Sequence, residues 1–411
     1  VLACARIGAA AAPMSARATA NEIAGMARAA GCGDVAVAEK DAAERVLEAT
    51  GAKPLSEEIL DGGSETSRRP QVADDDICIV LFTSGTTGAP KPVPFSHGVL
   101  GGRVKAFAQP PDPAAPTLVS ISCVPFHHVA GLVGVFVGLA GGNTVVLQRR
   151  FDAGAWLALV EKRRIQRVFL VPTLLHRIID HPDAARAGLS SVQLVTYGAA
   201  PATPELIARA KKLMPAAVFM QVFGQTETLG GVVALGPGDE AAAEKGSVGK
   251  AMTGVDVRVV DPMTGADVPD GDVGEFWARA PHTATPGWIR SGDLVRRDAD
   301  GYMYAVGRMS DVINRGGEKI DPAEVEEALR AHADVTDVAV AGFADADLGE
   351  NVGAVIVART SLDADDLRAH VRARLAPYKV PARFVFVDEI PLTELGKVSR
   401  RDLKRLLEGS G

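Results

Sequence analysis

The chain has 411 residues, more than one ordinary hydrophobic core accommodates, so two or more domains are expected. Hydrophobic residues make up 47% of it and charged residues 23%, the balance of a globular protein rather than of a disordered chain. Its 44 basic and 51 acidic side chains leave a formal charge of −7, which excludes the basic footprint of a nucleic-acid-binding protein.

The N-terminal part reads as short helices and strands followed by a loop. Residues 1–14 are rich in alanine but lack a basic leader, and Arg6 interrupts them, so they are not interpreted as a signal peptide. Apolar residues at helical spacing in 22–27 and an apolar run at 35–37 predict a helix and a short strand. Residues 56–76, rich in Glu, Asp, Gly and Ser, predict a loop.

Short continuous apolar runs recur from residue 77 onward, and helical stretches lie between several of them. Runs of this kind suit strands that are buried on both faces of a sheet. The alternation of strand and helix predicts a layered α/β domain. The runs cover 77–82, 118–121, 144–147, 168–171 and 194–197, and two of the helical stretches cover 156–163 and 204–213.

One stretch has the hydrophobicity of a membrane segment. Residues 113–148 carry no charged side chain, and 129–142 are wholly apolar. That apolar core is shorter than the ~20 residues that a spanning helix needs. It also contains five glycines. We therefore predict a buried, closely packed helix and no membrane span.

From about residue 248 the pattern changes to short strands and turns, which predict a small β-subdomain. Beyond Arg308 a further β/α region begins, and it contains a helix that starts at Pro322 with Asp321 as its N-cap. We place the domain boundary at Met309–Ser310, giving domains 1–309 and 310–411. The elements predicted in this half are 255–260, a turn at 262–265, 274–278, the helix 322–331, the strands 338–342 and 352–357, and the helix 362–375.

The four cysteines, Cys4, Cys32, Cys78 and Cys123, are scattered without a close pair. This spacing fits reduced, buried thiols of a cytoplasmic protein better than a disulfide framework or a zinc site. Each is interpreted as a small core residue and not as a nucleophile.

The segment 83–91 reads T-S-G-T-T-G-A-P-K and directly follows a predicted strand. Its glycines let backbone N–H groups face one point, and its hydroxyls and its lysine add donors, as polyphosphate binding requires. It is not a Walker A loop, because only two residues separate the glycines and Pro92 follows the lysine. A solvated turn is the alternative. The candidate phosphate-binding residues are Thr83, Ser84, Gly85, Thr86, Thr87, Gly88 and Lys91.

Seven further motifs follow this loop in order. With the loop, they resemble the adenylate-forming superfamily of AMP-binding enzymes, in particular its acyl-CoA synthetases, over nearly the whole chain. The resemblance implies a large N-terminal domain of layered α/β subdomains plus a small β-subdomain, and a small mobile α+β C-terminal domain. The part before Thr83 is shorter than is usual in the family, so the first subdomain is expected to be incomplete. The motifs are P-F-H-H-V-A-G-L (125–132), Y-G-A-A-P (197–201), Q-V-F-G-Q-T-E (221–227), S-G-D-L (291–294), G-R-M-S-D (307–311), R-G-G-E-K-I (315–320) and L-G-K-V-S-R (395–400).

The resemblance implies an ATP site made of several segments. The loop would hold the β- and γ-phosphates with Lys91 as a helper, while Asp293 and Arg308 would hold the ribose hydroxyls. Phe223 would stack on the adenine, at a position where the family usually has tyrosine. Without the motifs, an Asp–Arg pair is an ordinary surface pair. Gly198, Ala199 and Ala200 would form the adenine site with Phe223, and the other residues implied in nucleotide binding are Gln221, Gly224 and Gln225.

Four residues are implied in catalysis. Glu227 would be the Mg²⁺ ligand and Thr226 a contact to the α-phosphate, while His128 would lie beside the acyl pocket. Lys397 would bridge the acid's carboxylate and the α-phosphate, where a cation offsets the negative charge that gathers in the transition state. Without the motifs, the glutamate and the lysine would be ordinary solvated charges and His128 a core histidine.

The implied reaction has two steps at one site. A carboxylate attacks the α-phosphorus of ATP, giving an acyl-adenylate and pyrophosphate. The C-terminal domain then turns about a hinge at Ser310, withdraws Lys397, and brings residues 315–318, with Gly316 and Gly317 among them, to line a tunnel for the CoA thiol. Two other functions remain open: transfer to the phosphopantetheine thiol of a carrier protein, and a nucleotide-binding but catalytically weak fragment.

The acid is expected to be a small carboxylic acid and not an amino acid. Adenylation domains of peptide synthetases usually have an Asp after the residue that corresponds to Phe126, whereas this chain has His127 and His128. Glycines near 131 and 230 suggest an apolar pocket. The chain departs from the family at Ser310, usually Asp or Lys, and is shorter than usual in 279–288. A homodimer is an assembly that the sequence leaves open.

Overall fold

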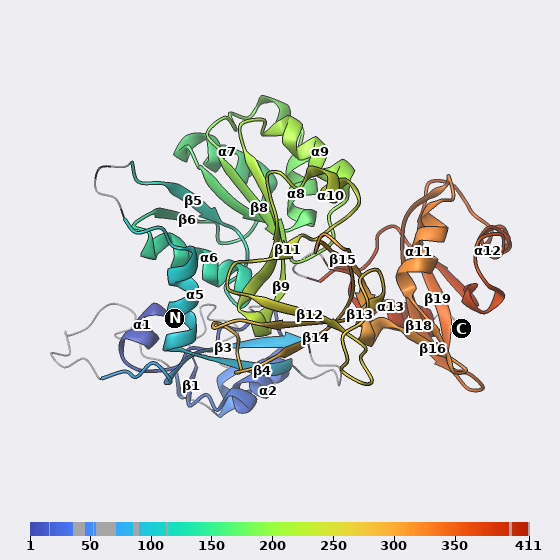
Figure 1. Ribbon diagram of the computed structural model, residues 1–411, viewed down its shortest axis with the longest axis horizontal. Helices are drawn as coiled ribbons and strands as arrows, with labels where there is room; N and C mark the ends of the chain where they lie inside the picture. Colours follow the sequence, from blue (N-terminus) through green and yellow to red (C-terminus); the bar gives the residue numbers. More distant parts are fainter. Residues whose placement is uncertain are drawn as a thin grey trace.

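The computed structural model describes residues 1–15, 17–35, 46–51, 53–54, 71–84, 90–111, 114, 116–393 and 397–409, with no description of the side chains of 35, 53, 54 and 84. The C-terminal residues, orange to red in Figure 1, form a lobe beside the rest of the chain. The predicted boundary at Met309–Ser310 falls in the 3₁₀ turn η3 (Met309–Asp311), between strands of two different sheets. The position of the boundary stays a prediction.

The large lobe is built on a seven-stranded sheet, as the recurring apolar runs predicted. Its strand order is β11-β10-β9-β8-β7-β5-β6. The strands β5, β6, β7, β8 and β9 are parallel to one another, whereas β10 runs antiparallel to β9 and β11 runs antiparallel to β10. The strands are β5 (Val119–Ser122), β6 (Thr144–Leu147), β7 (Arg167–Leu170), β8 (Leu194–Gly198), β9 (Val218–Gln225), β10 (Gly230–Leu235) and β11 (Lys250–Ala251). The helical elements around it are α5 (His97–Phe107), α6 (Val129–Ala140), α7 (Ala153–Arg163), α8 (Pro172–Ile179), η1 (Ala184–Arg186), α9 (Pro204–Leu213), η2 (Thr226–Thr228) and α10 (Glu240–Glu244).

Three helices of this lobe, α5, α7 and α9, start behind a capping side chain. The Asp152 side chain accepts a hydrogen bond from Ala155 N at the start of α7, and Thr203 does the same for Leu206 N at the start of α9. The apolar faces of α7 and α9 cover one side of the sheet, where Trp156 is fully buried. The predicted α/β layering is confirmed.

The helix predicted at 129–142 exists as α6, but it is less enclosed than expected. Only Gly131, Leu132 and Gly138 are buried in it, and Leu139 is 45% exposed. The apolar run therefore covers a partly open face rather than the centre of a core. No helix in the described part of the chain is long and apolar enough to cross a membrane.

The first strand of the phosphate-loop region does not join the large sheet. β3 (Ile77–Ser84) pairs only with β4 (Pro90–Ser96), in an antiparallel two-stranded sheet among the described strands. Three prolines lie in β4, and since proline has no N–H to donate, this strand suits an edge. The other N-terminal elements are α1 (Leu2–Arg6), α2 (Ala20–Ala30), β1 (Asp34–Val35) and β2 (Lys53–Pro54).

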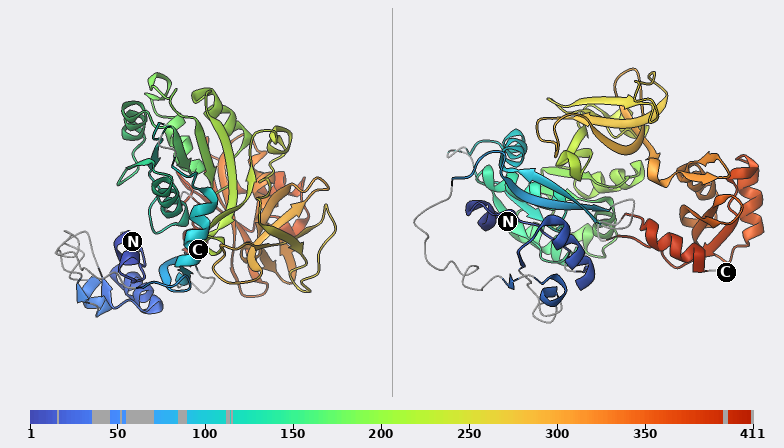
Figure 2. Two further views of the ribbon diagram at one scale, coloured as in Figure 1. Left: turned by 60° about the vertical axis from the view of Figure 1, so that its left-hand side comes forward. Right: turned by 90° about the horizontal axis from the view of Figure 1, so that it is seen from below.

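A four-stranded antiparallel sheet, β12-β13-β14-β15, forms the predicted β-subdomain. Its inner face packs on the large lobe through apolar side chains that include Phe276 and Val295. Figure 2 shows it between the large sheet and the C-terminal lobe. The strands are β12 (Asp256–Val260), β13 (Val273–Arg279), β14 (Ile289–Arg297) and β15 (Met303–Arg308).

The C-terminal lobe is a five-stranded sheet with helices on both faces. Val338 and Val340 point to the face covered by α11 and α12, whereas Ala339 and Ala341 point to the face covered by α13. These residues belong to the strand β18, which is buried on both faces at this point, and this burial explains why residues 338–344 are continuously apolar. The elements are β16 (Ile313–Arg315), β17 (Glu318–Ile320), α11 (Pro322–Arg330), β18 (Val335–Asp345), β19 (Gly349–Ala358), α12 (Ala364–Arg372), η4 (Pro377–Lys379), β20 (Arg383–Phe386) and α13 (Arg400–Gly409).

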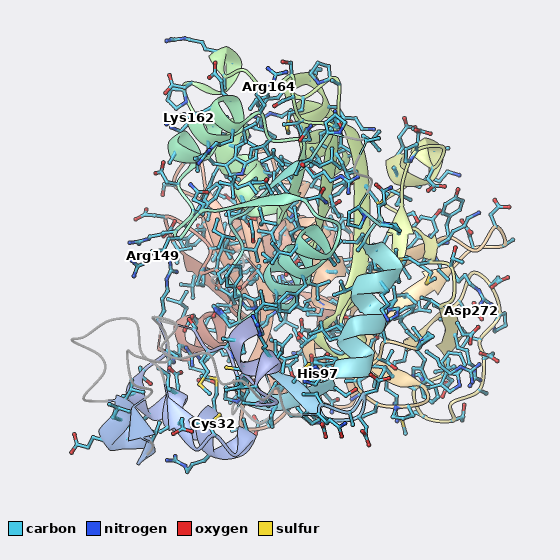
Figure 3. The ribbon with its side chains drawn as sticks, turned by 90° about the vertical axis from the view of Figure 1, so that its left-hand side faces the viewer. Cys32, His97, Arg149, Lys162, Arg164 and Asp272 are labelled. Carbon is cyan, nitrogen blue, oxygen red and sulfur yellow. The ribbon has the colours of Figure 1, made fainter. Side chains whose placement is uncertain are left out.

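The cysteine prediction holds in part. All four cysteines are free, but only Cys78 and Cys123 are buried, while Cys4 and Cys32 are partly exposed. Cys32 lies at the periphery just after α2 (Figure 3). Burial raises the pKa of Cys78 to about 11 and that of Cys123 to about 12, so these two thiols are poor nucleophiles.

Candidate active site

The two predicted adenine motifs lie side by side at the carboxyl ends of neighbouring parallel strands. β8 and β9 pair so that Gly198 lies opposite Val222. A Cβ on Gly198 would lie 2.2 Å from the Val222 carbonyl oxygen, so only glycine fits there. Ala199, the next residue, has a φ of +68°, the left-handed region that alanine rarely adopts. This end of a parallel sheet is where ligands of open α/β folds bind.

Phe223 and Gly224 continue this surface on β9. The Phe223 ring meets the buried Phe276 ring edge-on, with centroids 5.4 Å apart, so β13 fixes its orientation. A Cβ on Gly224 would lie 2.2 Å from the carbonyl oxygen of Gly230, which requires glycine at this point as well. Packing thus fixes the positions of both residues, which the sequence analysis predicts to bind the nucleotide.

Thr226 and Glu227 stand on a tight turn, η2. The turn is closed by Thr228, whose hydroxyl donates to Gly230 O at 2.7 Å and accepts from Gln225 N at 3.1 Å. Leu229, fully buried, follows with a φ of +51°. The backbone at Leu229, two residues after Glu227, is therefore held in a conformation that few side chains adopt, a kind of strain typical of functional sites.

A buried arginine that the sequence analysis did not single out braces the chain just after this turn. Arg103, on α5, is 4% exposed, and its Nη2 donates to Gly231 O at 2.6 Å. Its Nη1 lies 2.8 Å from His282 Nε2, which must accept. Desolvation lowers the pKa of Arg103 to about 10. Desolvation, together with the arginine's charge, lowers that of His282 to about 4. His282 is neutral at pH 7, as an acceptor must be.

The predicted ribose pair forms across two strands of the small sheet. Asp293 on β14 lies opposite Arg308 on β15, and Arg308 Nε donates to Asp293 Oδ1 at 2.6 Å. Desolvation raises the pKa of Asp293 in spite of the arginine, because the carboxyl is largely enclosed. Desolvation acts to lower the pKa of Arg308, but the neighbouring carboxylates, Asp293 first, outweigh it and the net shift is upward.

Lys397, in the C-terminal lobe, interacts electrostatically with this pair. It lies in the loop before α13, where Thr393 N donates to Lys397 O at 2.6 Å and Lys397 N donates to Thr393 Oγ1 at 3.2 Å. Its side chain keeps contact with solvent, yet the surrounding protein lowers its pKa, first by desolvation and then through the charge of Arg308, while Asp293 opposes the shift. The two lobes thus bring the predicted lysine and the predicted ribose pair together.

His128 lies within the same electrostatic neighbourhood. It is the residue before α6, and its ring lies 4.2 Å from that of His127, measured between centroids. Desolvation, followed by the charges of His127 and Lys397, lowers its pKa to about 3. His128 is therefore neutral over the working range of an enzyme and can present one N–H donor and one acceptor.

Asp311 and Arg400, which the motifs contain but which the sequence analysis gave no role, join the hinge to the lysine loop. Asp311 accepts from Ser310 Oγ at 3.1 Å and from Arg400 Nε at 3.2 Å. Arg400 Nη1 also donates to Val340 O at 2.5 Å. Arg400, the first residue of α13, thereby holds the segment that carries Lys397 against the residue just past the predicted hinge.

The chain matches the models of two protein families. Residues 1–287 match the AMP-binding enzyme family, and residues 324–397 match the AMP-binding enzyme C-terminal domain. The chain belongs to the AMP-binding enzyme family. The resemblance inferred from the motifs is confirmed.

Named relatives are acid:CoA ligases. The chain is 38% identical to feruloyl-CoA synthase of an Amycolatopsis species, over 84% of this chain and 73% of that protein. It is 35% identical to indoleacetate–CoA ligase of Aromatoleum aromaticum, over 84% of this chain and 70% of that protein. Among solved structures, the amide bond synthetase McbA of Marinactinospora thermotolerans superposes with a TM-score of 0.82 at 31% identity, covering 98% of this chain and 86% of that one.

The phosphate loop lies largely outside the described residues. Gly85, Thr86, Thr87 and Gly88 fall in that gap, as does the side chain of Ser84. The strands on either side are described: Thr83 pairs with Lys91 across the β3–β4 sheet, and Lys91 is exposed. The loop therefore joins two hydrogen-bonded strands, and its role with phosphate remains a prediction.

Gly316 and Gly317 are not brought to the other site residues. They form the two-residue turn between β16 and β17, with φ values of +59° and +98°, the pattern that such a hairpin turn demands. The Gly316 N–H donates to Leu348 O, within the C-terminal lobe. Their predicted role in lining the thiol tunnel requires the C-terminal lobe to turn about Ser310, as predicted for the second step.

Proposed function

We propose that the chain joins a carboxylic acid to CoA in two steps, consuming ATP and releasing pyrophosphate and AMP. The observation that carries this proposal is the position of Lys397: the C-terminal lobe holds it near enough to Asp293 and Arg308 of the large lobe for their charges to shift its pKa, and its own charge acts on His128. A lysine at such a junction can act in one half-reaction and be withdrawn for the next, as two reactions at one site require.

In the first step the acid's carboxylate attacks the α-phosphorus of ATP and pyrophosphate leaves. Attacking group and phosphate are both negative, so Lys397 would offset their repulsion and stabilise the charge of the transition state. Thr226, on the same turn as Glu227, would hold an α-phosphate oxygen. Neutral His128 would bind the carboxylate by hydrogen bonding and not by charge.

Mg²⁺ fits the residues present as an ion held mainly by the nucleotide. The described part of the chain contains no group of three His, Cys, Asp or Glu residues that could hold a metal. Mg²⁺ is usually bound by one or two carboxylates together with substrate phosphates and water. Glu227 would supply the protein's carboxylate, and the ion would neutralise phosphate charge.

In the second step the CoA thiol would attack the acyl carbon and release AMP. The lobe would turn about Ser310, removing Lys397 and bringing Gly316 and Gly317 to the thiol path. The relatives that are named CoA ligases support CoA as the acceptor. Free cysteines suit a reducing compartment, which supports a cytoplasmic location.

We propose an aromatic acid as the substrate, since feruloyl-CoA synthase and indoleacetate–CoA ligase both carry aromatic acids in their names. The stretch of α6 after His128 has partly open apolar residues, as a pocket wall requires. A cavity of about 180 Å³, lined by Tyr197, Lys211 and Glu240 among others, lies beside α9 and not beside α6.

A panel of acids read out by AMP release with CoA present tests the function. Substituted cinnamic and arylacetic acids should be turned over, and octanoic acid should be turned over more slowly. Acid-dependent exchange of pyrophosphate into ATP isolates the first step. No exchange with any acid in folded protein would refute the enzyme reading, while exchange without transfer to CoA would favour a carrier-protein thiol.

A further inference from the structure

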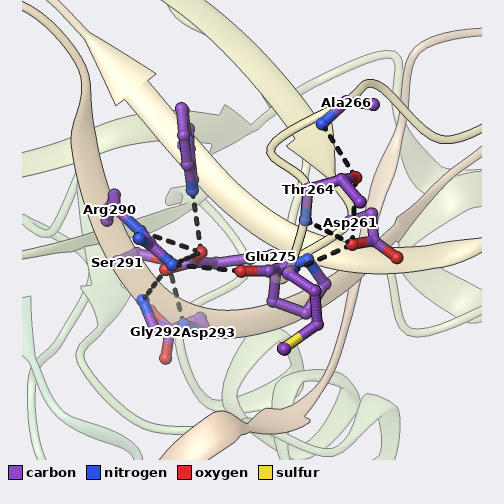
Figure 4. Close-up of polar contacts among 11 residues, drawn as sticks. Asp261, Thr264, Ala266, Glu275, Arg290, Ser291, Gly292 and Asp293 are labelled. Atoms are coloured by element: carbon purple, nitrogen blue, oxygen red, sulfur yellow. Dashed lines mark hydrogen bonds and ion pairs between the residues drawn. The ribbon is translucent and has the colours of Figure 1, made fainter.

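Glu275 is a buried carboxylate in the small sheet that neither the motifs nor the proposed mechanism uses. Its side chain is 3% exposed, and charged groups are kept in such places only when they are paired. Trp277 Nε1 donates to Glu275 Oε2 at 2.9 Å, and Arg290 donates to the same oxygen from Nε and Nη2 at 3.2 and 2.9 Å. Figure 4 shows these contacts together with a fourth, from Gly292.

The fourth contact lies at an irregularity of the sheet. Glu275 pairs with Leu294 and Trp277 pairs with Arg290, so a single residue on β13 faces three residues on β14. Those three are Ser291, Gly292 and Asp293. A bulge of this kind interrupts the ladder of backbone hydrogen bonds and re-aims a side chain.

The Glu275 side chain replaces the missing ladder partner. Gly292 N donates to Glu275 Oε1 at 3.3 Å, and Gly292 itself has a φ of +70°. Asp293 N donates to Ser291 Oγ at 2.9 Å, which closes the bulge from the other side. The next contact outward is the 2.6 Å bond from Arg308 to Asp293.

We propose that Glu275 is the positioning residue of the nucleotide's ribose site. It holds the bulge through Gly292, and the bulge aims the Asp293 carboxylate at Arg308 and at a ribose hydroxyl. Its own charge is balanced by Arg290 on the outer face of the sheet, so it braces the loop without adding negative charge to the phosphates. This inference rests on the proposed use of ATP.

The test compares nucleotides that differ only in the ribose. In the wild-type chain, 2′-deoxy-ATP or 3′-deoxy-ATP should bind about tenfold more weakly than ATP, the worth of a hydrogen bond to a charged group. Glu275→Gln keeps the size of the side chain but has one acceptor oxygen in place of two, so it cannot accept from both Arg290 and Gly292. The variant should bind ATP about tenfold more weakly than the wild type, and its affinities for ATP and for the same deoxynucleotide should agree within about twofold. Its kcat at saturating ATP should change less than its affinity for ATP.

Asp267→Asn is the matched control. It removes the negative charge from the 2.8 Å bond that Arg258 Nε donates to Asp267 Oδ1 in the same subdomain, and it leaves residues 291–293 untouched. Its discrimination between ATP and the deoxynucleotides should stay at the wild-type value. Thermal unfolding reports whether each variant is folded.

Each outcome decides the question. A folded Glu275→Gln chain that still discriminates as the wild type does would overturn the inference but not the proposed function. If that variant does not fold, Arg290→Met, which removes an exposed partner of Glu275, should lose at least about threefold of the discrimination, and its full retention would overturn the inference. A wild-type chain that binds no adenine nucleotide would overturn both.

Discussion

Gly198→Ala tests whether close packing of β8 on β9 builds the adenine site. The new Cβ would lie 2.2 Å from Val222 O, whereas ordinary contact begins at 3.4 Å, so one strand must move by more than 1 Å. Overpacking of this kind costs about 1–3 kcal/mol. The strands carry Ala199 and Phe223 at their ends, and a shift of this size disturbs both. We expect a free energy of unfolding lower by about 2 kcal/mol and a KM for ATP higher by about tenfold.

Gly236→Ala is the control for this substitution. Gly236 follows β10 of the same sheet, and nothing lies within 4 Å of a Cβ built there. The midpoint of thermal unfolding should fall by roughly 3 °C for Gly198→Ala and stay unchanged for the control. Equal midpoints together with equal KM values for ATP would show that the contact does not constrain the strands, and the reasoning would be refuted.

Three further predictions concern charge. Lys397→Ala should abolish acid-dependent pyrophosphate exchange yet spare thioester formation from pre-made acyl-adenylate; an equal loss in both assays would contradict the two-orientation account. Glu227→Gln should raise the Mg²⁺ concentration for half-maximal activity several-fold, because one charged ligand is lost, and an unchanged Mg²⁺ titration would remove Glu227 as a ligand. The pKa of His282 is lowered to about 4 from an ordinary value of 6.5, so the unfolded chain binds the proton more readily than the folded chain. Stability should therefore fall as the pH drops from about 6.5 to about 4, by up to about 3 kcal/mol from this group, and urea titrations of a His282→Gln chain should show a shallower fall.

Much of the fold followed from local pattern. α9 begins and ends at the predicted residues, and α11 begins at Pro322 behind the cap that Asp321 supplies, since its carboxylate accepts from Ala323 N. Proline, a capping side chain and apolar spacing determine where a helix begins and which face it buries, and all three act within a few residues of the chain. The motifs, likewise, are contiguous, so the family could be identified and its nucleotide site predicted without a structure.

Several features could not be read in this way because they depend on distant residues. The apolar stretch of α6 looks like a core helix in sequence, but its burial depends on which neighbours cover it. Arg103 and His282 are separated by 179 positions, and nothing near either one predicts their contact. A buried arginine is recognisable only once the surrounding groups are known.

The sequence by itself determined which residue types are available for phosphate, ribose and carboxylate chemistry, and in which order along the chain. Only the tertiary structure decided that Lys397 reaches Asp293 and Arg308, and that Glu275 supports the bulge beneath Asp293. The physical reason is that charge interactions and desolvation depend on distance and enclosure in space, which the folded arrangement of both lobes creates.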